Sequence, residues 1–171
     1  TVYDVYGNPF SANSLPTGQN LGDNANISID TTPPESTVSS VKYDGSTGTL
    51  TITGTKFLEI GVSAGGSVKD YLDYTKLTWD IDYNSSANPA LSDVTFAASD
   101  IDTAVVTNDT PLTVKLTSAA KTALHATTGF AAEGDATDFA DAIDVTAGFV
   151  RDKALNPSAD DAASNATLTY A

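Results

Sequence analysis

This sequence of 171 residues predicts an all-β fold, a β-sandwich with one or two short helices. Three observations support that class. Apolar and polar residues alternate in short runs, turn-forming residues separate the runs, and no long stretch has helical periodicity. Residues 49–53 and 112–116 show the alternation most clearly. Roughly seven to nine such strands separated by turns are typical of a sandwich.

The other expected elements follow from composition and turn chemistry. Further strands are expected at residues 27–29, 38–43, 76–81, 94–97, 104–106, 143–150 and 167–170. A turn is expected at residues 43–48, where the Asp44-Gly45 pair would supply positive φ. Short helices are expected at residues 118–125, with Ser118 as the N-cap, and at 136–142.

The charge balance is strongly acidic, with 22 acidic and 8 basic residues and a net charge of −14. This balance disfavours binding to nucleic acid or to an anionic membrane. The excess is aspartate, since the only glutamates are Glu35, Glu59 and Glu133. Short aspartate side chains in turns are common Ca²⁺ ligands. The composition therefore favours calcium binding, and the alternative is a solvated acidic surface.

Cysteine is absent from the sequence, which excludes disulfides and thiolate metal sites. No run of 18 apolar residues occurs, so membrane insertion is not expected. The chain begins directly in strand-like sequence and carries no signal peptide. We interpret it as a mature protein or an excised fragment with an extracellular, cell-surface location.

The sequence contains a short internal repeat, here called the echo. The pattern Val-x-Asp-x-x-x-Asn-Pro occurs at residues 2–9 and again at 150–157, and each copy is followed by a similar strand, at residues 24–29 and 165–170. Residues 1–30 are therefore expected to be the C-terminal hairpin of a preceding module or an exchanged arm that docks against a neighbour. Residues 31–35, with Pro33 and Pro34, would be a stiff linker. Residues 36–171 would form the module itself.

Residues 30–34, Asp-Thr-Thr-Pro-Pro, and residues 41–55, Val-Lys-Tyr-Asp-Gly-Ser-Thr-Gly-Thr-Leu-Thr-Ile-Thr-Gly-Thr, resemble the opening of bacterial immunoglobulin-like repeats. Such repeats occur in giant adhesins and in surface-layer or RTX-like surface proteins. The Asp-x-x-x-Asn turn at 152–156 resembles the closing Asp-x-x-Gly-Asn turn of that family, with Leu155 where glycine is expected. The resemblance implies an immunoglobulin-like sandwich with Greek-key character and a structural role. It does not identify a binding partner.

The resemblance also implies calcium ions at the junctions between modules, where a linker aspartate meets loop carboxylates. Asp80 and Asp82 alternate along an expected strand and so share a face, and Asp135, Asp138 and Asp141 fall three apart on the second expected helix. No EF-hand loop or nonapeptide repeat is present. The candidate ligands are Asp4, Asn8, Asp30, Asp80, Asp82, Asp152, Asn156, Asp160 and Asp161.

Carbohydrate binding and hydrolysis are the other functions to consider for this sequence. Tyr71, Tyr74, Trp79 and Tyr83 would form the stacking platform of a carbohydrate-binding module, although a core position for Trp79 is favoured. A single histidine, His125, without a nucleophile motif gives no support for a hydrolase, so the chain is expected not to be an enzyme. The Asn-x-Ser/Thr sequons that a glycosylating source would modify are Asn26, Asn84, Asn108 and Asn165.

The sequence thus predicts a calcium-stabilised structural module of an adhesin, surface layer or filament, mediating assembly or adhesion. Its expected partners are neighbouring identical modules or subunits, and surface glycans or a host or abiotic surface. The first alternative is a self-assembling filament subunit that uses residues 1–30 for strand addition to the sheet edge of a neighbour. The second is the carbohydrate-binding module.

Overall fold

The computed structural model describes residues 30–81, 92–130 and 141–171. The chain divides into two compact units, Thr1–Thr32 and Pro33–Ala171. The boundary between them lies within the linker that the sequence predicts at residues 31–35. The second unit holds the described strands and helices, and the fold is described for that unit.

In its described residues the second unit is mostly β, with two sheets of five and three strands and one α-helix, an arrangement that fits an all-β sandwich. Hydrogen bonds between β7 and β8 connect the two sheets, so that the eight strands form one continuous ladder. Along the hydrogen-bonded ladder the order is β4-β3-β7-β8-β1-β2-β6-β5. The strands are β1 (Thr37–Asp44), β2 (Thr49–Thr55), β3 (Leu77–Asp80), β4 (Val94–Thr95), β5 (Ile101–Val106), β6 (Leu112–Leu116), β7 (Ala142–Val145) and β8 (Ala163–Tyr170).

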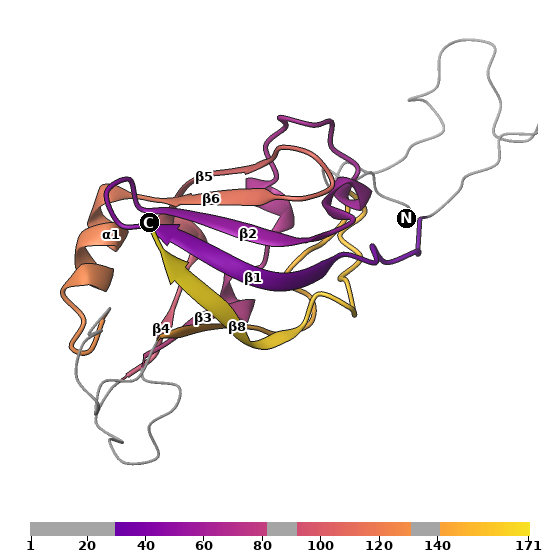
Figure 1. Ribbon diagram of the computed structural model, residues 1–171. Helices are drawn as coiled ribbons and strands as arrows, with labels where there is room; N and C mark the ends of the chain where they lie inside the picture. The colour runs from indigo at the N-terminus through magenta and orange to yellow at the C-terminus, as the bar shows by residue number, and fades with distance from the viewer. Residues whose placement is uncertain (1–29, 82–91, 131–140) are drawn as a thin grey trace, which may run out of the picture. The chain divides into compact units, whose positions relative to one another are not determined.

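Strand β8 joins the two sheets. Its first half is antiparallel to β7, with Ala163 opposite Val145 and Thr167 opposite Ala142. Its second half is parallel to β1, with residues 167–170 opposite residues 40–43. Because the two strands run in the same direction, β8 ends where β1 ends, at the end of the unit opposite the linker (Figure 1).

The helices are short. The only α-helix in the described residues is α1 (Ser118–His125), which matches the first helix predicted from the sequence. Its N-cap is Thr117 rather than Ser118, because the Thr117 hydroxyl accepts a hydrogen bond from the Ala120 amide at 3.2 Å. Single 3₁₀ turns that the sequence did not predict form η2 (Phe57–Ile60), η3 (Lys69–Tyr71), η4 (Tyr74–Lys76) and η5 (Ala98–Asp100).

The turn between β1 and β2 is closed by Asp44. Its Oδ1 accepts hydrogen bonds from the Ser46 amide at 2.9 Å, the Ser46 hydroxyl at 2.7 Å and the Thr47 amide at 3.3 Å. These bonds lower the pKa of Asp44 to about 2. The positive φ falls at Gly48, at 75°, and not at Gly45 as predicted, because the Gly48 amide donates back to the Asp44 carbonyl at 2.8 Å in a wider turn.

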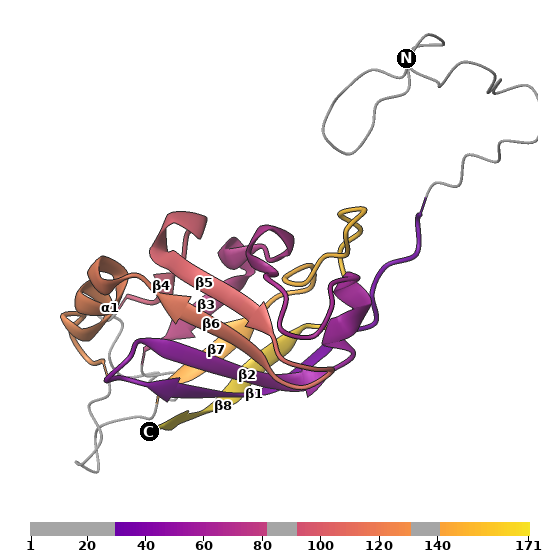
Figure 2. The same ribbon diagram turned by 90° about the horizontal axis from the view of Figure 1, so that it is seen from above.

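The core lies between the two sheets. Alternate residues of β2, β3 and β6 are buried, and the fully buried core side chains include Tyr43, Leu50, Trp79 and Leu112 from strands and Phe149 from the loop after β7. Tyr43 of β1 packs edge-on against Trp79 of β3, with ring centroids 5.0 Å apart, so the two sheets meet at these rings. Figures 1 and 2 show α1 beside the β1–β2 turn, at the end of the core where β1 and β8 finish.

Most of the predicted strands are confirmed, and two segments differ. The strand predicted at residues 143–150 ends at Val145, and Gly148 follows with a φ of 91° that an extended strand does not allow. The helix predicted at residues 136–142 falls mostly outside the described residues, and its last residue, Ala142, is instead the first residue of β7. The strand predicted at residues 27–29 lies outside the described residues.

Candidate functional site

Asp80 lies in a crowded acidic group at the end of β3. Thr78 and Asp80 face away from the core, and Asp144 of β7 stands opposite Thr78 in the ladder. Asp93, just before β4, accepts the Ile81 amide at 3.3 Å. Partial burial, followed by repulsion from Asp93 and Asp144, raises the pKa of Asp80 to about 6. A cation or a proton would relieve this repulsion.

The turn at residues 152–156 is held by hydrogen bonds between its first and last residues. The Asp152 carboxylate accepts the Asn156 backbone amide at 2.9 Å through Oδ1 and the Asn156 side-chain amide at 2.8 Å through Oδ2. Leu155 has a left-handed φ of 67°, at the position where the resembling family has glycine. The two predicted calcium ligands of this turn therefore hydrogen-bond to each other.

Asp161 is fully buried and binds the backbone of the preceding loop. Its Oδ1 accepts the Gly148 amide at 3.0 Å and its Oδ2 accepts the Val150 amide at 2.6 Å. Burial raises the pKa of Asp161, and the hydrogen bonds from Val150 and Gly148 oppose that rise. This carboxylate ties the loop after β7 to the start of β8 through these two backbone amides.

The remaining predicted ligands are either exposed or outside the described residues. Asp30 is exposed, and its Oδ1 accepts the Thr32 amide at 3.0 Å. Asp160 is exposed next to Asp161. Asp4, Asn8 and Asp82 lie outside the described residues. In the parts of the chain that the structure describes, no group of three or more His, Cys, Asp or Glu side chains could hold a metal ion.

The predicted carbohydrate platform is largely inside the protein. Trp79 is fully buried and Tyr74 is 2 % exposed, so neither ring offers a face to a sugar, and the core interpretation of Trp79 is confirmed. The Tyr74 hydroxyl donates to the Lys69 carbonyl at 3.1 Å. Tyr71 is half-buried against the core, and Tyr83 lies outside the described residues. The described rings therefore form no shared stacking surface.

The single histidine belongs to an aromatic cluster at the end of the core. His125 Nε2 lies 2.8 Å from the Tyr43 hydroxyl, and the imidazole stacks on Phe130 with centroids 4.7 Å apart. Burial raises the pKa of Tyr43 to about 12, so the phenol stays protonated at neutral pH. This arrangement anchors α1 and the segment after it to the core.

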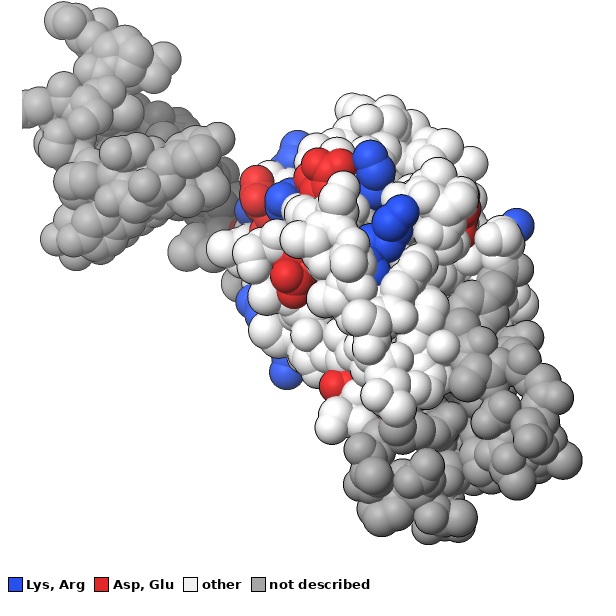
Figure 3. Space-filling model, turned by 90° about the vertical axis from the view of Figure 1, so that its left-hand side faces the viewer, with Lys and Arg blue, Asp and Glu red and all other residues white. Residues whose placement is uncertain are grey.

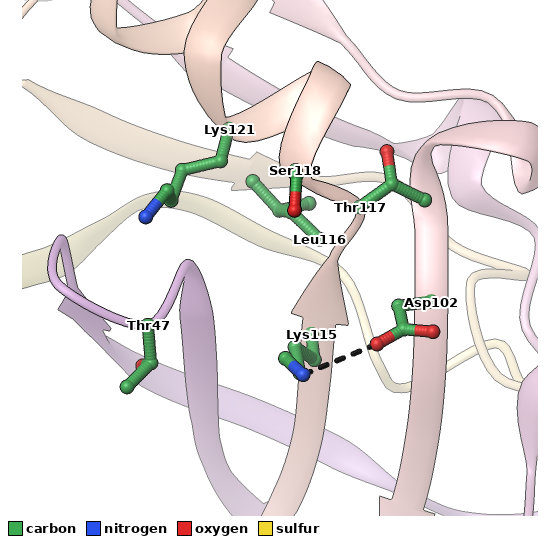
Figure 4. Close-up of a pocket in the computed structure, with 7 residues that line it drawn as sticks. All are labelled: Thr47, Asp102, Lys115, Leu116, Thr117, Ser118 and Lys121. Carbon is green, nitrogen blue, oxygen red and sulfur yellow. Dashed lines mark ion pairs between the residues drawn. The ribbon is translucent and has the colours of Figure 1, made fainter.

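A small depression on the described surface lies between α1, the β1–β2 turn, the start of β5 and the end of β6 (Figure 4). It measures about 230 Å³, smaller than the sites that take drug-sized ligands. Lys115 forms an ion pair with Asp102 at 3.2 Å, and Lys121 donates to the Ser46 carbonyl at 2.9 Å. Both ammonium groups are already bonded to other groups of the protein, so the depression could hold at most a small polar group. Sequence reasoning missed it, because the lysines come from separate elements.

Charge on the described surface is mixed rather than of one sign. The face shown in Figure 3 carries acidic and basic side chains beside one another. Arg151 pairs with Asp73 at 2.9 Å, and Lys56 lies beside both Glu35 and Glu59. Of the sequons, Asn108 is exposed and accepts the Thr110 amide at 2.8 Å, and Asn165 lies in β8. Asn26 and Asn84 lie outside the described residues.

A scan against protein-family models found no match, and searches of curated proteins and of solved structures found none either. Among the described helices, none has both the length and the apolar character needed to cross a membrane.

Proposed function

We propose that the chain is a non-enzymatic structural module of a repetitive extracellular surface protein, with an immunoglobulin-like topology. One observation supports this most strongly. Because β1 and β8 are parallel and adjacent, the chain enters the unit at one end and leaves it at the other. A unit built this way lengthens a chain of like units when it is repeated.

The entry to the unit is firmly seated, as a spacer requires. Pro34 and Ser36 are buried, and the Ser36 carbonyl accepts the Ser158 hydroxyl at 3.3 Å. Between them, the Glu35 amide donates to Glu59 at 2.7 Å. The start of the unit is therefore fixed to its body at residues 34–36, which suits a semi-rigid joint between modules.

Calcium stabilisation is part of the proposal, and its support is mainly compositional. The described carboxylates of Asp152 and Asp161 accept hydrogen bonds from the protein's own amides. Repulsion from Asp93 and Asp144 at Asp80 supports a general attraction for cations near β3 and β7, although the described side chains form no group that could hold a metal ion.

The filament alternative needs an open sheet edge. One outer strand, β5, is already covered, because the Gly65 amide donates to the Val106 carbonyl at 2.7 Å and the Val68 amide to the Ala104 carbonyl at 2.9 Å. Such covering blocks edge-to-edge pairing. This favours a covalently linked repeat over a subunit that polymerises through β5.

Sedimentation velocity of the full chain and of residues 33–171 separates the two. A repeat module predicts that both are monomers at micromolar concentration. A filament subunit predicts that the full chain assembles into polymers and that residues 33–171, which lack the exchanged arm, do not. Polymerisation confined to the full chain would therefore overturn the proposal in favour of strand addition.

A further inference from the structure

We infer that this unit carries tension, and that the paired strands β1 and β8 are its mechanical clamp. The inference extends the proposed structural role to a specific property, resistance to pulling along the chain. It follows from the order and direction of the strands.

The two strands that would receive the load are bonded directly to each other. Ser40, Val41, Lys42 and Tyr43 of β1 stand opposite Thr167, Leu168, Thr169 and Tyr170 of β8. The Ala171 amide extends this contact by donating to the Tyr43 carbonyl at 2.9 Å. Hydrogen bonds between parallel strands are evenly spaced along the pair.

Tension applied at residues 33 and 171 would pull β1 and β8 past each other. β1 would be drawn toward the linker and β8 toward the opposite end, each along its own axis. In that geometry the bonds of the pair share the force, and several must break together. If the strands were instead pulled apart from one end, the bonds would break one at a time, at a lower force.

Both strands are also held to the body, so that the load reaches the clamp. On the entry side Pro34 and Ser36 are buried, ahead of β1. β1 is paired on its other edge with β2 along its whole length. On the exit side β8 is held to β7 by its first half, and Ala166 in that half is only 5 % exposed. Neither terminal strand is a free edge that could peel away first.

Single-molecule force spectroscopy on the full chain tests the inference. One set of handles is placed at the two chain termini, which loads β1 and β8 in shear. The other set is placed at the C-terminus and at Thr47→Cys in the exposed β1–β2 turn, which peels β8 from β1 starting at Tyr170. The absence of native cysteine makes the attachment unique.

We expect a rupture force for the second unit at least about twofold higher between the termini than in the peeling geometry, because several hydrogen bonds must break at once. Unfolding of residues 33–171 releases a longer stretch of chain than unfolding of residues 1–32. The larger increase in contour length therefore identifies the rupture of the second unit. Equal rupture forces in the two geometries would overturn the inference while leaving the proposed structural role untouched, since the measurement depends on the fold alone.

A matched pair of variants isolates the clamp. Thr169→Gly weakens β8 opposite Lys42, and Thr113→Gly weakens β6 opposite Thr51, outside the β1–β8 pair. The two substitutions are similar threonine-to-glycine changes in strands. At matched thermal stability, Thr169→Gly should lower the rupture force between the termini more than Thr113→Gly. An equal reduction by both variants would mean that β1 and β8 are not the clamp.

Discussion

The indole Nε1 of Trp79 donates a hydrogen bond to Asp141 Oδ2 at 2.7 Å, and both side chains are buried. The bond links β3 to the residue just before β7, within the three-stranded sheet. A buried carboxylate is tolerated when it receives such donors, and a buried tryptophan usually finds a partner for its N–H. The buried hydrogen bond to Asp141 shows that Trp79 is a core residue of the fold.

Trp79→Phe should lower the free energy of unfolding by about 2–4 kcal/mol, because it loses both buried volume and the buried hydrogen bond to Asp141. Asp141→Asn keeps an oxygen acceptor for the indole and should cost less. Urea unfolding of the two variants measures the difference. If Trp79→Phe left stability unchanged but abolished binding to a glycan array, the carbohydrate-binding alternative would replace the core interpretation.

Leu155 occupies a backbone conformation that suits glycine, with a φ of 67°, while its side chain is 53 % exposed. Left-handed geometry costs a non-glycine residue about 1–2 kcal/mol, and glycine's greater unfolded-state entropy cancels part of the gain. Leu155→Gly should therefore stabilise the unit by about 0.5–1 kcal/mol in thermal or urea unfolding. The control is Ala154→Gly, which has no positive φ to relieve and should destabilise. Equal losses from both would show that the turn carries no such strain.

The raised pKa of Asp80, about 6, links stability to pH. The folded state binds this proton more tightly than the unfolded state, so the contribution is fully present below about pH 4 and is lost as pH rises through 6. After solvent screening we expect a loss of about 1–2 kcal/mol between pH 4 and pH 7. Asp44 and Asp73, whose pKa values are lowered, act in the opposite direction and below that window. Asp161, whose pKa burial raises, acts in the same direction as Asp80. Asp80→Asn should therefore reduce the stability difference between pH 4 and pH 7 in EDTA, and an unchanged difference would contradict this assignment.

Calcium should raise the melting temperature. A ligand that binds only the folded state adds about 2.7 kcal/mol at a hundredfold excess over its Kd, which corresponds to several degrees at about 2–4 °C per kcal/mol. Melting in EDTA and in millimolar CaCl₂ at constant ionic strength measures the shift, with NaCl as the control. Asp80→Asn should reduce it. Superimposable curves would remove calcium from the proposed function.

The sequence predicted those strands and helices that are specified by residues close together in the chain. Alternation identified β6 with its observed bounds, and the alanine-rich segment identified α1. The parallel pairing of β1 with β8 could not be predicted this way, because it joins strands from opposite ends of the unit and depends on tertiary packing. The candidate ligands could not be assigned from the sequence for a related reason. An aspartate in a turn looks the same in sequence whether it faces a cation or, like Asp161, two backbone amides.

The echo between residues 2–9 and 150–157 was more informative than composition. It placed Gly7 in register with Leu155, and the left-handed φ at Leu155 shows why glycine suits that position. No comparable sequence signal marked Asp141 as the partner of Trp79, because 62 residues separate them and the contact arises only when β3 and β7 pair.

The central claim is that this unit extends a chain end to end, and a tandem chain tests it most directly. Two copies of residues 33–171 are joined by the native segment Asp30-Thr31-Thr32, and the maximum dimension is measured by small-angle X-ray scattering. Three residues span only about 10 Å, so copies whose entry and exit lie at opposite ends cannot fold back on one another. We predict a maximum dimension about twice that of a single copy, since this reach forces end-to-end contact. A compact particle with the two copies side by side would contradict the account.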